Sequence, residues 1–350
     1  MKQAFWKNRS VFLSGHTGFK GGWLALWLSE LGAKVHGYSL EMPSNPNFFS
    51  EIKLEDRIES STIGDIRDLD KLISSMYSSK ASVVIHMAAQ SLVRESYNSP
   101  LETFTTNIIG TVNILEAVRK AETVEAIVNI TTDKCYDNKE WFWPYRENDS
   151  LGGHDPYSSS KACAELISSS YRKSFLMESG THLASVRAGN VIGGGDWGKD
   201  RLIPDLFRAI DTGKTLRIRS PNSVRPWQHV LEPLSGYLML AEKLILNGEQ
   251  FAEAWNFGPL ESDTKAVSWI VEHLCKNIPK SVWVVDDSIK LHEAGFLKLD
   301  STKAKTKLGW KPRWPLEIAL AKTLDWHQSW KKNQSMAEIS IEQIKAYEKL

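Results

Sequence analysis

Short apolar runs alternate with longer amphipathic segments along the first half of the chain. The short runs predict buried strands at residues 11–13, 34–38, 81–86, 126–130 and 182–187. The longer segments, whose apolar residues return every three or four positions, predict helices at residues 23–31, 70–78, 107–121 and about 158–177. Strands that alternate with helices in this way favour an α/β fold built on a doubly wound parallel sheet.

Three glycines stand between the first predicted strand and the first predicted helix. Gly15, Gly18 and Gly21 recur at every third position. Without side chains there, the backbone N–H groups and the positive end of the helix can approach a pyrophosphate. A tight turn without a ligand is the plainer alternative, but the strand at residues 34–38 completes a strand–helix–strand unit. We therefore interpret residues 1–188 as a Rossmann-like dinucleotide-binding domain.

The regular alternation ends near residue 188. Residues 193–198 begin with three consecutive glycines and predict a flexible break, and short helices and strands follow without a regular rhythm. We expect residues 189–350 to form a smaller, mixed α/β substrate-binding region, from which a strand or helix returns to the first sheet.

Composition and charge narrow the possible partners. The chain has 350 residues, of which 42% are hydrophobic and 24% charged, and its formal net charge is +1. So small a net charge gives no global field to recruit nucleic acid or an anionic membrane, and we expect neither partner. We find no apolar signal-peptide core and no stretch near the ~18 apolar residues of a membrane span, so we expect a cytoplasmic protein. The three cysteines have no CxxC spacing and indicate neither a metal site nor a disulfide framework.

A tyrosine and a lysine lie one helical turn apart in the helix predicted at about residues 158–177. Tyr157 and Lys161 stand at positions i and i+4, which share one helix face. A phenol with a pKa near 10 is a poor base at neutral pH, but a nearby cation stabilises the phenolate. The same spacing is common on protein surfaces, where it has no catalytic role. Here the pair follows several strand–helix units and a dinucleotide-type turn, which favours a catalytic role.

Polar residues follow the strand predicted at residues 126–130. Thr132, Asp133 and Lys134 come directly after it, and the carboxyl ends of parallel strands are where open α/β sheets bind ligands. We expect the hydroxyl, the carboxylate and the amine to point into one cleft. The alternative is an ordinary strand-ending turn with a helix cap.

With these segments in place, the chain resembles the extended short-chain dehydrogenase/reductases and, within them, the nucleotide-sugar 4,6-dehydratases. The resemblance covers nearly the whole chain. It is carried by residues 15–21, 64–67, 86–90, 107–111, 132–134, 157–161, 187–190, 223–227 and 308–312.

The resemblance implies two sets of binding residues and a catalytic set. The cofactor set comprises Gly15, His16, Thr17, Gly18, Phe19, Lys20, Gly21, Ser39, Asp65, Ile66, Ala88, Ala89, Gln90, Thr131, Tyr157 and Lys161. Within it, Asp65 and Ile66 are expected at the adenine, and residues 88–90 at the middle of the cofactor. The substrate set comprises Asn190, Arg201, Arg219 and Arg225, expected near the diphosphate of a sugar nucleotide. The catalytic set comprises Thr132, Asp133, Lys134, Tyr157 and Lys161. Asn107 is expected mainly to begin a helix.

The cofactor is expected to be NAD, held loosely. Folds that prefer NAD usually carry Asp or Glu at the end of the second strand, and this chain has Ser39 there, with Glu41 just beyond. However, no Lys or Arg lies between Lys34 and Lys53 to hold a 2′-phosphate, and the resemblance also implies NAD.

The reaction that the resemblance implies has three steps at one site. The sugar C4 is oxidised while Tyr157 takes the hydroxyl proton and Thr132 binds the same hydroxyl, water is lost across C5 and C6, and the hydride returns to C6. Oxidation comes first because a C4 ketone acidifies the C5–H bond. Asp133 is the expected acid for the departing C6 hydroxyl, and Lys134 stands where relatives carry a glutamate base.

A charged Lys134 cannot act as a base and would favour the ionised form of Asp133. We therefore hypothesise a desolvated, neutral Lys134 beside a protonated Asp133, the two titrating as a coupled pair. Lys134→Gln should still oxidise the sugar but stop exchange at C5. Unchanged exchange would direct attention to another residue such as Glu147.

Two other functions stay open at this point. A nucleotide-sugar 4-epimerase shares Tyr157 and Lys161 but needs no acid–base pair for elimination, and a cofactor-binding sensor would have lost the chemistry. The residues alone do not choose the nucleotide base or the sugar. The helices predicted at residues 107–121 and 158–177 could pair with a second copy, so a homodimer or homotetramer is expected.

Overall fold

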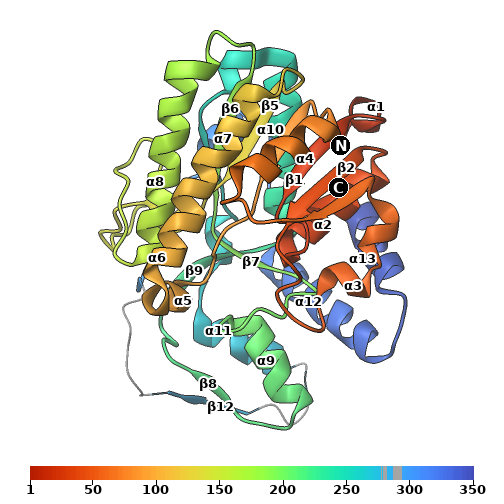
Figure 1. The fold of residues 1–350 in the computed structure, drawn as a ribbon. Helices are drawn as coiled ribbons and strands as arrows, with labels where there is room; N and C mark the ends of the chain where they lie inside the picture. Colours follow the sequence, from red (N-terminus) through yellow and green to blue (C-terminus); the bar gives the residue numbers. More distant parts are fainter. Residues whose placement is uncertain (277, 279–281, 287–293) are drawn as a thin grey trace.

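The computed structural model describes residues 1–276, 278, 282–286 and 294–350. Its centre is a seven-stranded sheet in which every strand pair is parallel, in the order β10-β6-β5-β4-β1-β2-β3 (Figure 1). The strands are β1 (Ser10–Ser14), β2 (Lys34–Ser39), β3 (Ser60–Ile63), β4 (Val83–His86), β5 (Ala126–Ile130), β6 (His182–Ala188) and β10 (Ala254–Phe257). The predicted fold class, an α/β fold with a doubly wound parallel sheet, is confirmed.

Helices cover both faces of this sheet. On one face lie α2 (Phe19–Glu30), α10 (Leu231–Asn247) and, packed on α2, α13 (Met336–Glu348); on the other lie α4 (Leu69–Ser79), α7 (Gly110–Lys120) and α8 (Pro156–Tyr171). Short helices α1 (Gln3–Trp6), α3 (Phe48–Glu51), α5 (Val93–Asn98) and α6 (Pro100–Phe104) lie in the connections.

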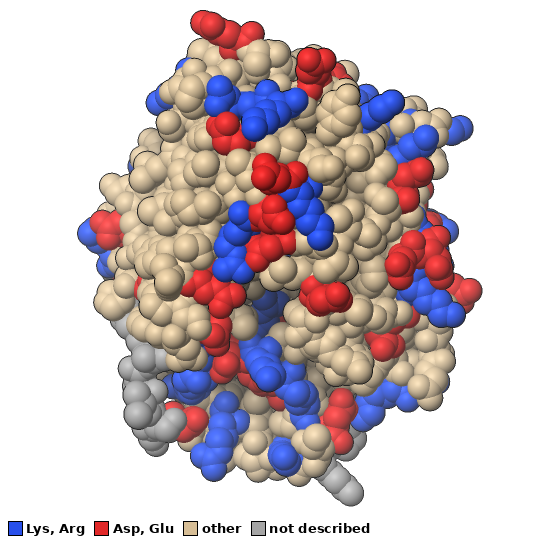
Figure 2. Space-filling model, viewed as in Figure 1, with Lys and Arg blue, Asp and Glu red and all other residues tan. Residues whose placement is uncertain are grey.

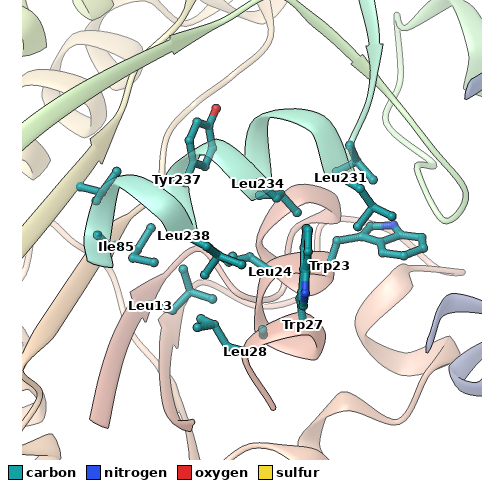
Figure 3. Packing of buried hydrophobic residues seen from close by; sticks show 14 of the residues in the cluster. Leu13, Trp23, Leu24, Trp27, Leu28, Ile85, Leu231, Leu234, Tyr237 and Leu238 are labelled. Carbon is teal, nitrogen blue, oxygen red and sulfur yellow. The ribbon is translucent and has the colours of Figure 1, made fainter. Parts of the chain in front are cut away.

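The large hydrophobic cluster includes residues of α2 and α10 together with residues of β1 and β4. Trp23, Leu24 and Trp27 of α2 are fully buried against Leu234 and Leu238 of α10 (Figure 3). Burial of each such side chain stabilises the fold by roughly 2 kcal/mol. Apolar residues cover the whole circumference of α2 rather than one stripe, because the helix is enclosed by the sheet, α10 and α13.

A smaller unit follows the sheet strand β6. It contains a three-stranded sheet in the order β11-β9-β7 and a strand pair β12-β8. Its elements are β7 (Asn190–Ile192), α9 (Leu202–Asp211), β8 (Leu216–Ile218), β9 (Val224–His229), β11 (Thr264–Ala266), α11 (Val267–Lys276) and β12 (Trp283–Val285), and the start of α12 (Leu316–Lys331) closes its core. Strand β10 and helix α10 come from this later half of the chain and lie on the large sheet.

Two predicted helices have different ends in the structure. The helix expected at residues 107–121 starts as a π-helical turn at Thr105–Ile109 before α7, and the one expected to reach residue 177 passes from α8 into a π-helical turn at Arg172–Leu176. The edge strand β3 was not predicted, because its half-exposed Ser and Thr residues do not form an apolar run.

Candidate active site

A cleft of about 1550 Å³ opens at the carboxyl ends of the sheet strands, facing the smaller unit. A pocket for one small ligand is typically about 300–1,000 Å³, so this cleft has room for two ligands side by side. Figure 2 shows Lys and Arg side chains gathered in the hollow at the lower centre of the molecule, with acidic side chains along its edge. The segments that line it follow β1, β4, β5 and β6 or come from α8, α9 and β9.

The glycine turn between β1 and α2 fits a diphosphate. Gly15 has a φ of +83°, and a Cβ on it would lie 2.8 Å from the backbone nitrogen of Ala88. A Cβ on Gly21 would lie 2.1 Å from the Gly15 oxygen. Gly18 is the N-cap of α2 and offers no side-chain cap, so the first backbone N–H groups of the helix remain available to an anion.

The other residues of the turn have different surroundings. The His16 ring is buried and bonds through Nε2 to Ser61 Oγ at 2.8 Å, and burial lowers its pKa to about 4. The ring therefore points away from the cleft, and His16 can meet a cofactor only through its backbone. Thr17 and Ser39 join through their hydroxyls at 2.7 Å and both line the cleft.

Lys20 reaches the centre of the site rather than the helix surface. Its Nζ donates a hydrogen bond to the Tyr237 hydroxyl of α10 at 3.0 Å. Burial, together with the charges of Lys161 and Arg201, lowers the pKa of Lys20 to about 7. Sequence analysis did not find Tyr237, because it stands in an apolar helix that reads as core; in Figure 3 its hydroxyl points away from the apolar cluster.

The predicted adenine-binding residues lie at the carboxyl end of β3. The Asp65 carboxylate accepts hydrogen bonds from the backbone N and side-chain Nε of Arg67, at 2.8 and 2.9 Å for the shorter contacts, and these bonds lower the pKa of Asp65. Both Asp65 and Ile66 line the cleft.

The segment after β4, with Ala88, Ala89 and Gln90, also lines the cleft and is held by Asn107. The Asn107 amide accepts from the Gln90 backbone N and donates to the Gln90 carbonyl, both at 2.9 Å, and donates to Ser160 Oγ of α8 at 2.8 Å. Asn107 lies inside the π-helical turn rather than at a helix start. The expectation of a helix-start residue was therefore wrong: its buried amide ties the cofactor-side segment to α8.

Tyr157 and Lys161 lie one turn apart near the start of α8, and both are buried. The helix begins at an Asp155 cap, whose carboxylate accepts from the Ser158 N at 2.9 Å. Lys161 Nζ donates to the Ile130 carbonyl at 3.1 Å, and burial lowers its pKa to about 8. Burial raises the pKa of Tyr157 to about 12, and a hydrogen bond with Thr132 opposes this only in part. In this structure burial therefore outweighs the hydrogen bond, and the net shift of the phenol pKa is upward.

Thr132, Asp133 and Lys134 follow β5 and lie together. Thr132 and Lys134 line the cleft, but Asp133 does not, because it is fully buried, although all three side chains were expected to point into the cleft. The Thr132 hydroxyl donates to Asp133 Oδ1 at 3.0 Å, and Lys134 Nζ lies 3.7 Å from the same oxygen. The Asp133 side chain is 1% exposed, and its Oδ2 has no hydrogen-bond partner among the described residues. The Lys134 side chain is 27% exposed, so the complete desolvation assumed in our hypothesis is not present in this structure.

A buried ion pair between Glu165 and Arg187 lies next to the catalytic residues. Glu165, one turn beyond Lys161, accepts from the Arg187 guanidinium at 2.9 Å and from the Thr131 hydroxyl at 2.5 Å. The Thr131 side chain therefore turns toward α8, although the residue lines the cleft. Sequence analysis missed Glu165, and its i+4 spacing from Lys161 was the available signal. Glu147 accepts from the Asn256 N at 2.9 Å, beside this network rather than in the cleft, so it is poorly placed as a base.

All four predicted substrate residues line the cleft: Asn190, Arg201, Arg219 and Arg225. Arg201 bonds both oxygens of Asp196 at 3.1 Å, and Arg219 bonds Asp200 at 3.1 Å. Asp196 and Asp200 therefore hold the guanidinium groups of Arg201 and Arg219 in place. An incoming diphosphate that binds these two arginines competes with the two carboxylates.

Within the described part of the chain, no group of three or more His, Cys, Asp and Glu side chains could hold a metal ion. No helix there has the length and apolar character needed to cross a bilayer.

The glycine turn on a doubly wound sheet, with Thr132 after β5 and with Tyr157 and Lys161 on α8, defines a short-chain dehydrogenase/reductase. The chain belongs to the GDP-mannose 4,6 dehydratase family, whose profile matches residues 12–323. A curated relative, CDP-glucose 4,6-dehydratase of Salmonella typhimurium, is 51% identical over 349 residues, which cover 98% of this chain and 97% of the relative.

Solved structures share the fold. The dTDP-glucose 4,6-dehydratase of Bacillus anthracis in complex with NAD has a TM-score of 0.77 at 22% identity, covering 93% of this chain and 98% of that one. The UDP-glucose 4-epimerase of Thermotoga maritima, with UDP-glucose, has a TM-score of 0.76 at 23% identity, covering 92% and 99%. Because dehydratases and epimerases share this architecture, the fold does not separate the two reactions.

Proposed function

We infer that this chain is a NAD-dependent nucleotide-sugar 4,6-dehydratase that converts CDP-glucose to CDP-4-keto-6-deoxyglucose and water. The observation that carries the inference is the buried Asp133 carboxyl, which lies beside Thr132 and Lys134 at the end of β5. An epimerase has no leaving group to protonate and does not need this carboxyl. The relative at 51% identity, a CDP-glucose 4,6-dehydratase, supports the same reaction and the choice of CDP-glucose.

The cofactor half of the cleft fits NAD. The glycine turn offers unpaired N–H groups to a diphosphate, and a Cβ on Gly15 or Gly21 would close it. The dTDP-glucose 4,6-dehydratase of known structure, which shares this fold, is in complex with NAD. NAD when bound supplies a hydride acceptor for C4 and returns that hydride to C6.

The chain's own residues supply the proton transfers. Tyr157 takes the C4 hydroxyl proton while Thr132 binds that hydroxyl, and Lys161 orients the cofactor ribose. Asp133 protonates the C6 hydroxyl as it leaves. We propose Lys134 as the base for the C5 proton, because its Nζ is the nearest amine to Asp133 in the cleft; a bound sugar would cover the exposed part of its side chain.

Residues 189–350 are proposed to bind the sugar nucleotide, because Asn190, Arg201, Arg219 and Arg225 all come from this part. We also propose a cytoplasmic homodimer or homotetramer. Ile109 and Leu166, beside α7 and on α8, are 47% and 59% exposed, which suits an interface between copies. Cys135 and Cys163 are thiols, which fits a reducing compartment.

The test is incubation with a panel of nucleotide hexoses without added reductant. The expected result is loss of one water from CDP-glucose, measured by mass, with deuterium from C4 recovered in the new methyl group. A 4-epimerase would leave the mass unchanged, and turnover of another nucleotide in preference to CDP would overturn the choice of substrate. Lys134→Gln is expected to stop exchange of the C5 proton with solvent while the sugar is still oxidised.

A further inference from the structure

A continuous set of hydroxyl and carboxyl groups joins two catalytic residues that the proposed reaction uses in different steps. The Thr132 hydroxyl donates to Asp133 Oδ1 at 3.0 Å and also interacts with the Tyr157 phenol. Thr132 is in extended backbone conformation at the end of β5 and caps the short turn Asp133–Cys135. The side chain is thereby fixed between the two acids.

The resting state of this cluster poses a difficulty for the reaction. Burial raises the pKa of Tyr157 to about 12, so the phenol carries a proton at neutral pH and cannot accept another. Asp133 Oδ1 accepts a hydrogen bond from the Thr132 hydroxyl at 3.0 Å, so this oxygen is placed to receive a proton from Thr132. The phenol must therefore lose its proton before it can act as the base, and the elimination step needs a proton on Asp133.

We propose that Thr132 relays a proton from Tyr157 to Asp133 during oxidation of the sugar, so that one transfer prepares both the base and the acid. This inference rests on the proposed function. Asp133 is nearly inaccessible to solvent, with 1% of its side chain exposed, so a proton delivered through Thr132 avoids direct exchange with bulk water.

The proton balance closes over one turnover. The sugar O4–H bond breaks and its proton joins the Tyr157 oxygen; the former phenol proton joins the Thr132 oxygen, and the former Thr132 proton joins Asp133 Oδ1. Asp133 then gives that proton to the C6 oxygen, the C6–O bond breaks, and water leaves. The base returns the C5 proton and the hydride lost from C4 is restored at C6. The enzyme ends with the protonated phenol and the carboxylate with which it began.

The relay makes Asp133 necessary for oxidation as well as for elimination. Charge alone predicts the opposite: the carboxylate raises the pKa of Tyr157, so its removal should ease loss of the phenol proton. A neutral Asn resembles a protonated Asp in shape but cannot receive a proton. Asp133→Asn therefore separates a relay from a purely electrostatic or structural role.

The experiment uses CDP-6-deoxyglucose, which has no C6 hydroxyl and can only be oxidised at C4. With enzyme in excess of this probe and NAD present, formation of the ketone is followed by mass as loss of two hydrogens. We expect Asp133→Asn and Thr132→Val each to slow this oxidation by about 100-fold, the scale of a lost proton transfer. The double variant should be no slower than either single variant, and Thr132→Ser, which keeps the hydroxyl, should recover at least about a tenth of the wild-type rate.

Each other outcome overturns the relay. Oxidation by Asp133→Asn at or above the wild-type rate would confine Asp133 to the elimination step. Slow oxidation in Thr132→Val alone would confine Thr132 to binding the C4 hydroxyl, and additive losses in the double variant would show two independent roles.

Thermal melting of each variant checks folding. If Asp133→Asn does not fold, the dependence of the oxidation rate on the deuterium fraction of the solvent decides: a curved dependence in the wild type that becomes linear in Thr132→Val supports several protons moving together, and a linear one in both opposes it. Failure of the proposed function is distinct, because the wild type would then release no water from CDP-glucose.

Discussion

Lys161 is a buried ammonium, and replacing it with methionine should make the cofactor-free protein more stable while it abolishes catalysis. Methionine has a similar volume and no charge to desolvate. Burial lowers the pKa of Lys161 from its ordinary value of 10.5 to about 8, which corresponds to about 3 kcal/mol of destabilisation when the group is charged. Loss of the hydrogen bond to the Ile130 carbonyl returns about 1 kcal/mol. The expected net gain at pH 7 is therefore about 2 kcal/mol, or about 3 °C in Tm for a chain of 350 residues.

The pH dependence of the stability difference tests whether desolvation of Lys161 is its cause. Below about pH 8 Lys161 is protonated in both the folded and the unfolded protein, and the folded state bears the full desolvation cost. Above pH 10.5 it is neutral in both states and the cost is absent. The advantage of Lys161→Met should therefore be largest at pH 7 and decline between pH 8 and 10.5.

The assay is thermal and urea unfolding of both proteins at several pH values without added cofactor. Lys173→Met, at an exposed position just beyond α8, serves as a matched control and should change stability by less than about 0.5 kcal/mol. A loss of stability in Lys161→Met at pH 7, or a gain of equal size at pH 7 and pH 10.5, would refute the reasoning.

Two further predictions concern the frame of the site. Gly21→Ala should destabilise the protein by about 2 kcal/mol or more and weaken cofactor binding, because its Cβ would lie 2.1 Å from the Gly15 oxygen; Gly18→Ala, whose Cβ would lie 3.4 Å from the same oxygen, should be milder in denaturant unfolding. Glu165→Gln should cost about 3 kcal/mol in urea unfolding, because it leaves the Arg187 guanidinium buried without its carboxylate. The double variant with Arg187→Met should recover much of that loss, and a double variant as unstable as the single one would contradict this explanation.

The carboxyl end of β5 shows how much of the site could be predicted from the local sequence. An apolar run followed by Thr132, Asp133 and Lys134 predicted a strand end with polar groups in a cleft; Thr132 and Lys134 line the cleft, whereas Asp133 is buried behind its lining. The shared helix face of Tyr157 and Lys161 was equally predictable from the sequence. A spacing of four residues on a helix places two side chains on one face, whatever the rest of the chain does. The burial that raises the pKa of Tyr157 could not be predicted, since it is set by elements distant in sequence.

By itself, then, the sequence determined the alternation of strands and helices, the glycine turn and the short motifs at the strand ends, because each depends on neighbours within a few residues. Only the tertiary structure decided that Lys20 donates to Tyr237 of α10, that Asn107 ties a loop to α8, and that Glu165 pairs with Arg187. These contacts join residues that are far apart in the chain. They form because buried polar groups need hydrogen-bond partners, and only the tertiary packing decides which partner lies within reach.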